Sequence, residues 1–208
     1  MKFFCLIPLI LGNLYAVQSV QMKKQHFFNL LVPPVKSVYA ELNEEFLRVK
    51  SDINSSHNLQ KIETLKKIYK VESNQELLMA LKPHPPSIVL AQAAMESAWA
   101  TSRFFVKANN VFGMWSSNKK ENRIAAKEKR NGKRTIWLKK FSTIKASIKA
   151  YYKTLARAKE YKKFRKYRYA SKDVYKIIKG LDKYSEMGQE YVKSLKSVIK
   201  HNKLQKYD

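Results

Sequence analysis

The apolar positions of this chain recur three and four residues apart along most of its length. This spacing places apolar side chains on one face of a helix, which can then pack on a core. Ser73 and Glu76 form a capping box, and Gly180 is expected to stop a helix because glycine is common just past helix ends. The pattern predicts one mainly helical unit, with helices over 35–53, 59–68, 77–81, 144–155, 174–178 and 191–199.

The stretch from Ile124 to Phe141 departs from the helical pattern. It contains Asn131-Gly132, the pair that best suits a two-residue turn between antiparallel strands. With a loop of that length, Glu128 faces Thr135 and lies diagonally across from Trp137 on one face of the hairpin. The sequence therefore predicts a small β-hairpin lobe beside the helices.

One helix is apolar on nearly every side. It follows Pro85-Pro86, a tolerated helix start, and its few polar residues include Gln92 and Glu96, which share one face. A helix of this kind is expected to be buried. Burial and the negative end of the helix dipole would both raise the pKa of Glu96. A protonated Glu suits general acid catalysis, whereas the alternative is a structural Glu that pairs with Arg103 or a backbone donor.

An asparagine-rich turn follows this helix. Asparagine tolerates left-handed backbone conformations and bonds nearby backbone, so Asn109 and Asn110 either shape the turn or contact a ligand. The aromatic residues Phe112 and Trp115 either line a groove or fill the core. The sequence leaves both pairs of alternatives open.

Composition adds a strong positive charge. The chain has 42 Lys and Arg against 16 Asp and Glu, a net charge of +26 over 208 residues. Such a field attracts polyanions and is screened by salt, so anionic glycans, nucleic acids and membrane surfaces are all candidate partners. The sequence contains no zinc-ligand spacing, RNP-like segment or heptad zipper, which disfavours nucleic acid.

Residues 1–21 are predicted to form a signal peptide that exports the chain to the periplasm or cell envelope. Lys2 precedes an apolar stretch, and Ala16 is a candidate cleavage point. An uncleaved anchor is the alternative, although the stretch is short for a membrane span. Cys5, the single cysteine, lies in this segment, and the four histidines lack metal-ligand spacing. No metal or cofactor is therefore expected.

Several separated motifs resemble one enzyme family. The segment AQAAMESAWATSRF followed by NNVFGMW resembles the catalytic-helix motif of glycoside hydrolase family 73, the bacterial N-acetylglucosaminidase domains that cut peptidoglycan. Two further segments resemble the Bax-type branch of that family. They are FSTIKASIKAYYKTLARAKEYKKFR and LDKYSEMGQEYVKSLKSVIKHNKL. The resemblance runs in order from Met22 to Leu204.

The resemblance implies a lysozyme-like α+β fold, mostly helical, with an N-terminal helical segment over 22–84 packed on a catalytic domain over 85–208. It implies a monomeric peptidoglycan hydrolase that acts after N-acetylglucosamine. A muramidase, a lytic transglycosylase and a non-catalytic protein that binds the cell wall or nucleic acid are the alternatives. Glu96 is then the general acid, Tyr184 lies near the acetamido group, and Glu128 is the second carboxylate, with Glu121 as its alternative. Substrate contacts are expected from Gln92, Asn109, Asn110, Phe112 and Trp115.

Overall fold

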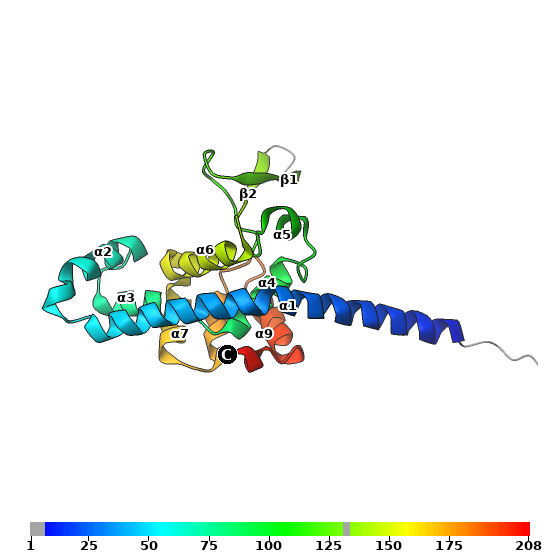
Figure 1. Ribbon diagram of the computed structural model, residues 1–208, viewed down its shortest axis with the longest axis horizontal. Helices are drawn as coiled ribbons and strands as arrows, with labels where there is room; N and C mark the ends of the chain where they lie inside the picture. The colour runs from blue at the N-terminus through cyan, green and yellow to red at the C-terminus, as the bar shows by residue number, and fades with distance from the viewer. Residues whose placement is uncertain (1–6, 131–133) are drawn as a thin grey trace, which may run out of the picture.

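The computed structural model describes the backbone of residues 7–130 and 134–208 and the side chains of residues 19–126 and 135–208. Helices pack around one long helix, and a two-stranded antiparallel hairpin stands apart from them (Figure 1). This confirms the predicted mostly helical α+β fold with a hairpin lobe. The elements are α1 (Ile7–Asp52), η1 (Ser56–Asn58), α2 (Leu59–Tyr69), α3 (Asn74–Leu81), α4 (Pro86–Glu96), α5 (Arg103–Ala108), β1 (Arg123–Arg130), β2 (Arg134–Lys139), α6 (Ile144–Arg157), η2 (Lys159–Tyr161), α7 (Lys162–Ala170), α8 (Val174–Ile177), η3 (Ile178–Leu181), α9 (Gln189–His201) and η4 (Leu204–Tyr207).

Helix α1 passes through Pro33 and Pro34, although the sequence predicts a helix that begins after them. A proline inside a helix costs about 3 kcal/mol, because it removes a hydrogen bond and crowds the preceding turn. Phe27 and Leu31 before the prolines and Val35 after them are all fully buried, where α1 packs on α4 and α6. This packing offsets the cost and keeps α1 continuous.

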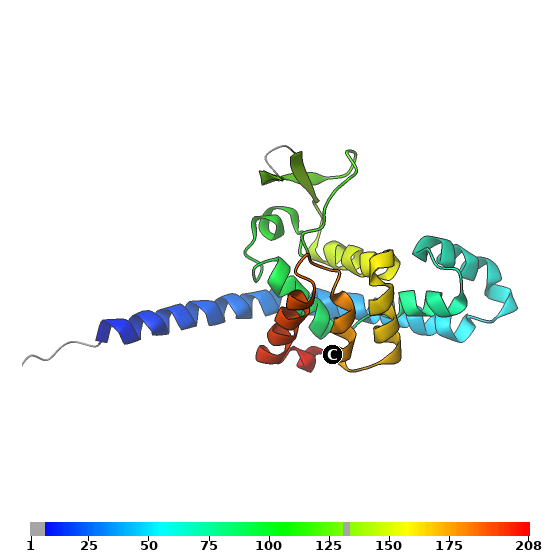
Figure 2. The same ribbon diagram turned by 180° about the vertical axis from the view of Figure 1, so that it is seen from behind.

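The N-terminal part of α1 projects beyond the other helices (Figure 2). The helix runs across the predicted boundary at residues 21 and 22, and the signal peptide stays a prediction. Within the described part of the chain, no helix is long and apolar enough to span a membrane.

Two apolar cores lie along α1. The larger joins α1 to α4, α6, α8 and α9, while Phe46 and Val49 of α1 belong to the smaller core with residues of α2 and α3. Ser73 accepts a hydrogen bond from the Glu76 backbone nitrogen, which confirms the predicted cap of α3. Helix α1 therefore ties both cores together.

Helix α4 lies at the centre of the larger core, as its apolar sequence predicts. Residues 86–94 are all buried, and the helix packs on α1, α9 and η4. Its N-terminal turn is held by Asp208, whose carboxylate accepts hydrogen bonds from the Ser87 backbone nitrogen at 2.7 Å and the Ser87 hydroxyl at 2.8 Å. Both the flank and the N-terminus of this helix are fixed, and Glu96 is its last residue.

The hairpin register differs from the prediction. Arg130 pairs with Arg134, so three residues rather than two lie between the paired positions. The register also shifts between Ala125 and Lys129, and Lys129 rather than Glu128 faces Thr135. An irregularity of this kind places extra residues in one strand, and strands that are polar on both faces specify their register weakly. The Glu128 side chain and residues 131–133 lie outside the described part of the chain.

The sequence predicts that Gly180 stops a helix, and this is wrong. Gly180 lies inside η3, which continues directly from α8, and among the described residues the glycines with positive φ are Gly113 and Gly188. A Cβ atom at Gly180 would lie 2.4 Å from the Cα atom of Phe164 in α7. Glycine is therefore required because two backbones approach closely.

Candidate active site

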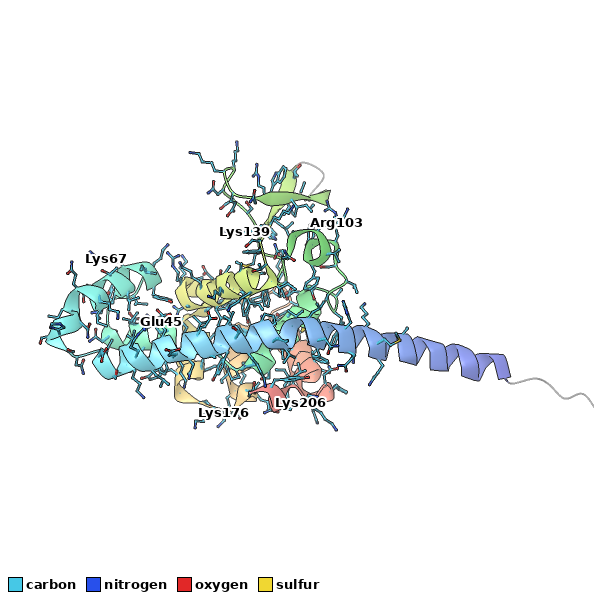
Figure 3. All side chains as sticks on the ribbon, viewed as in Figure 1. Glu45, Lys67, Arg103, Lys139, Lys176 and Lys206 are labelled. Carbon is cyan, nitrogen blue, oxygen red and sulfur yellow. The ribbon has the colours of Figure 1, made fainter. Side chains whose placement is uncertain are left out.

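Glu96 is half-buried at the C-terminal end of α4. Burial raises the pKa of its carboxyl group above the ordinary value of 4.5, and a hydrogen bond from Tyr191 offsets part of this rise. Arg103 does not pair with Glu96, because its guanidinium donates to the Ala125 carbonyl at 2.8 Å at the base of the hairpin (Figure 3). The carboxyl group therefore keeps its proton to a higher pH than an exposed Glu.

This raised pKa should make stability depend on pH. Between the unfolded pKa and the raised folded pKa of Glu96, the folded protein binds more protons than the unfolded chain, so its free energy of unfolding falls as pH rises. The contribution is fully present below the unfolded pKa and is lost through the folded one. Denaturant titrations of the protein and its Glu96→Gln variant from about pH 4 to pH 8 measure this. We expect the stability of the protein relative to the variant to fall with pH, and a constant difference would contradict the burial cost.

The chain leaves α4 through a left-handed turn. Ala98, Trp99 and Ala100 have φ angles of 51°, 60° and 66°, and non-glycine residues pay about 1–2 kcal/mol each for this conformation. Ser97 holds the turn: its hydroxyl donates to the Ala93 carbonyl at 2.6 Å and accepts from the Ala100 nitrogen at 2.8 Å. Strain of this kind persists only where the surroundings fix the backbone. The backbone next to Glu96 is therefore rigidly determined.

Helix α1 supports this turn from outside. The Trp99 ring packs edge-to-face on Phe27 and Phe28, with centroid distances of 5.1 and 5.9 Å. The Lys24 ammonium lies 4.9 Å from the centroid of the Trp99 ring. Residues of α1 thus contribute to the position of Glu96.

Three tyrosines surround the carboxyl group. The Tyr191 hydroxyl donates to Glu96 Oε1 at 3.1 Å. The Tyr184 ring stacks on that of Tyr191 with a centroid distance of 5.3 Å, and the Tyr161 ring lies 6.1 Å from Tyr184. No hydrogen bond to the Tyr184 hydroxyl is found among the described residues. Tyr184 thus places a hydroxyl group without a described hydrogen-bond partner near Glu96.

Gln92 is fully buried one turn before Glu96. Its amide nitrogen donates to the Tyr191 hydroxyl at 2.8 Å, and its amide oxygen accepts from the Tyr151 hydroxyl. Because both ends of the amide are occupied, this placement favours a positioning role over direct contact with a sugar.

The two asparagines of the turn bond to backbone. Asn109 has a left-handed conformation at the end of α5, and its amide donates to the Phe141 carbonyl at 3.1 Å. Asn110 is buried; its amide nitrogen donates to the Lys139 carbonyl at 2.9 Å and its oxygen accepts from the Met114 nitrogen at 2.9 Å. These bonds join the turn to the end of β2. They favour the alternative in which both asparagines shape the turn.

The two aromatic residues of this segment differ in exposure. Phe112 is buried and stacks on Tyr151 with a centroid distance of 3.9 Å, so it fills the core. Trp115 is 59% exposed and pairs through its backbone with Leu138 at the base of the hairpin. Of the two, only Trp115 has an exposed side chain.

Glu121 is the described candidate for a second carboxylate. It forms an ion pair with Lys139 at 3.1 Å, and hydrogen bonds from Ser116 and Lys139 lower its pKa, so it stays ionised at neutral pH. Lys139 lies at the base of the hairpin (Figure 3). No group of three His, Cys, Asp or Glu side chains that could hold a metal is found in the part of the chain with described side chains.

A family model described as mannosyl-glycoprotein endo-beta-N-acetylglucosaminidase matches residues 72–204, which is more than half of the chain. The chain belongs to the glucosaminidase family. Glu96, its left-handed turn and the three tyrosines all lie inside the matched range of this glycoside hydrolase domain. No curated protein sequence matches the chain.

Several solved structures are similar to this chain at low sequence identity. The catalytic domain of the autolysin Auto from Listeria monocytogenes is 19% identical and matches with a TM-score of 0.60 over 100% of both chains. A glycoside hydrolase domain of FlgJ from Salmonella typhimurium is 21% identical over 66% of this chain and 97% of that one, with a TM-score of 0.46. A peptidoglycan hydrolase from Sphingomonas is 20% identical over 64% and 86%, with a TM-score of 0.48. The match to the autolysin supports the lysozyme-like fold of this chain.

One residue in contact with Glu96 is not evident from the sequence pattern. Tyr191 is in register with the apolar positions Leu195 and Val198 of α9, which is typical of a core residue. It is indeed buried, yet its hydroxyl is bonded to Glu96. Helical spacing reports burial only, so the partner of a buried hydroxyl group appears only in the structure.

Proposed function

We propose that this chain hydrolyses the β-1,4 bond after N-acetylglucosamine in peptidoglycan, with Glu96 as general acid. The observation that carries the proposal is the half-buried Glu96 carboxyl, whose pKa is raised, at the end of the buried helix of a glucosaminidase domain. A carboxyl group that keeps its proton to a higher pH can give that proton to a leaving glycosidic oxygen.

The rest of the reaction needs a group that assists water. When the bond to the leaving oxygen breaks, Glu96 supplies the proton and the sugar becomes cation-like at its anomeric carbon. Water then attacks that carbon with help from Glu128, from Glu121 or from the substrate acetamido group. The separation of the two carboxyl groups decides between inversion and retention. The rates of Glu121→Gln and Glu128→Gln variants will distinguish the two carboxylates.

Charge supports peptidoglycan as the substrate. The stem peptides and lactyl groups of this polymer carry carboxylates, and a net charge of +26 attracts such a polyanion. An exposed Trp115 ring and the Tyr184 hydroxyl would suit a sugar with an apolar face and polar edges. Export to the periplasm or cell envelope, where this polymer lies, belongs to the same proposal.

The products of purified peptidoglycan test the proposal directly. Mass spectrometry of a digest should show reducing N-acetylglucosamine ends. Reducing muramic acid ends would instead identify a muramidase, and anhydro-muramic ends a lytic transglycosylase. No release of fragments would overturn the enzymatic proposal in favour of a wall-binding protein.

Tyr184→Phe should lower turnover while leaving the melting temperature nearly unchanged. The change removes the unbonded hydroxyl and keeps the ring that stacks on Tyr191. If the hydroxyl contacts the acetamido group or positions water, its loss costs about 0.5–1.5 kcal/mol, which is roughly a twofold to thirteenfold fall in rate. Rates on peptidoglycan and thermal unfolding measure the two effects. A lower melting temperature with a normal rate would make Tyr184 structural.

A further inference from the structure

A line of buried polar groups crosses the larger core and ends at Glu96. It begins on α7, crosses α6 and α4, and reaches the carboxyl group through α9. Each group lies within hydrogen-bond distance of the next. The members of this polar chain, in order, are Arg168, His84, Tyr151, Gln92, Tyr191 and Glu96.

The half of the polar chain next to Glu96 has one direction of donation. An amide nitrogen only donates, so the Tyr191 oxygen accepts from Gln92 Nε2 at 2.8 Å. The single proton of the Tyr191 hydroxyl is then directed to Glu96 Oε1 at 3.1 Å. The Gln92 oxygen in turn accepts the proton of the Tyr151 hydroxyl.

The same argument fixes the proton on His84. The Tyr151 hydroxyl donates its only proton to Gln92. The contact of 2.9 Å between the Tyr151 oxygen and His84 Nε2 therefore requires Nε2 to donate. Burial, with a further contribution from Arg168, holds the pKa of His84 well below its ordinary value, so the ring is neutral. His84 therefore carries its proton on Nε2 and has a bare Nδ1.

Arg168 sets the direction of the whole chain. Its guanidinium has donors only, is 2% exposed, and places Nη1 at 3.5 Å from His84 Nδ1. Its other terminal nitrogen donates to the carbonyls of Met79 and Ala80. If the Gln92 amide were reversed, each bond would reverse and a proton on His84 Nδ1 would face a guanidinium N–H. The permanent donor thus excludes the reversed arrangement.

We infer that Arg168, His84, Tyr151 and Gln92 are positioning residues that place the acidic proton of Glu96 on Oε2. Because Oε1 accepts the Tyr191 hydroxyl, a protonated Glu96 carries its proton on the other oxygen. The inference rests on the proposed role of Glu96 as general acid. It adds that Oε1 is bonded to the protein and that Oε2 carries the proton for the substrate.

The polar chain also acts on the acidity of Glu96. A donor to a carboxylate stabilises its ionised form, so the bond from Tyr191 lowers a pKa that burial raises. The titratable groups that face Glu96 among the described side chains are Tyr161, Tyr184 and Tyr191. Weakening the chain at a distance should therefore raise the pKa of Glu96.

Tyr151→Phe tests the inference, with Tyr152→Phe as its matched control. Both tyrosines are buried on α6 and bond to His84, but the Tyr152 hydroxyl donates to the His84 backbone carbonyl and lies outside the polar chain. The Glu96 side-chain carboxyl carbon, followed by NMR against pH, should titrate at higher pH in Tyr151→Phe and be unchanged in Tyr152→Phe. Turnover at the pH plateau should fall about threefold to tenfold in Tyr151→Phe alone. Equal titration in both variants would overturn the inference.

The tautomer of His84 gives a second test that needs no variant. Nitrogen-15 chemical shifts of the unmodified protein should show a protonated Nε2 and a bare Nδ1, and the opposite tautomer would overturn the direction of the chain. This test remains valid where Tyr151→Phe fails to fold. Neither NMR measurement requires a substrate. An inactive protein with the expected NMR results would therefore refute the proposed function alone, and an active protein with unchanged Glu96 titration would refute the polar chain alone.

Discussion

Replacing Glu96 with Gln should abolish cleavage of peptidoglycan. The amide keeps the shape of the side chain and can still accept the Tyr191 hydrogen bond, but it has no proton to give to the leaving oxygen. Loss of a general acid costs about two to four orders of magnitude in rate. Release of soluble fragments from purified peptidoglycan, followed with time, measures the change.

Glu190→Gln is the control for this substitution. Glu190 is exposed on α9 beside Tyr191 and pairs only with Lys193 among the described residues, so its change should leave the rate unaltered. The Glu96→Gln variant should also remain folded at neutral pH, because it removes a carboxyl group that is costly to ionise in its half-buried position. A Glu96→Gln variant that keeps more than about half of the rate would remove Glu96 from the mechanism.

Replacing Gly180 with Ala should destabilise the fold. The added Cβ would lie 2.4 Å from the Cα atom and 2.7 Å from the nitrogen of Phe164, a fully buried residue of α7. Backbone atoms cannot rotate away, so α7 or η3 must shift. Overpacking of this kind costs about 1–3 kcal/mol, which exceeds the gain of up to about 1 kcal/mol from replacing glycine in a helical segment.

Denaturant titration of Gly180→Ala measures this loss as a lower free energy of unfolding. Lys179→Ala is the control, because Lys179 is the exposed neighbour in the same short helix. It should change stability by less than about 0.5 kcal/mol. Equal stability of the two variants would show that α7 and η3 can separate without cost.

Local signals in the sequence are sufficient to predict much of the fold. The cap at Ser73 and the apolar run of α4 depend on residues a few positions apart, and the structure shows both. The continuity of α1 through its prolines depends on burial against α4 and α6, which local propensity does not contain. The same is true of Gly180, whose constraint comes from Phe164 on another helix.

The sequence likewise predicts some features of the candidate site and not others. The position of Glu96 at the end of a buried helix follows from the sequence, because both helix end and burial are patterned there. The contacts of Gln92 and Phe112 cannot be predicted in this way, because a side chain with the same helical spacing can face a ligand groove or another helix. Only the structure shows that both meet Tyr151. Glu128 remains a prediction, because its side chain lies outside the described residues.

The long helix α1 lies outside the family match but inside the larger core. The family match begins at residue 72, whereas Phe27, Leu31 and Val35 complete the larger core from α1. A fragment trimmed to the match would expose that core to water and leave Trp99 without its aromatic neighbours Phe27 and Phe28. Residues 72–204 are thus a unit of shared ancestry, and the unit that folds and carries a rigid Glu96 includes α1.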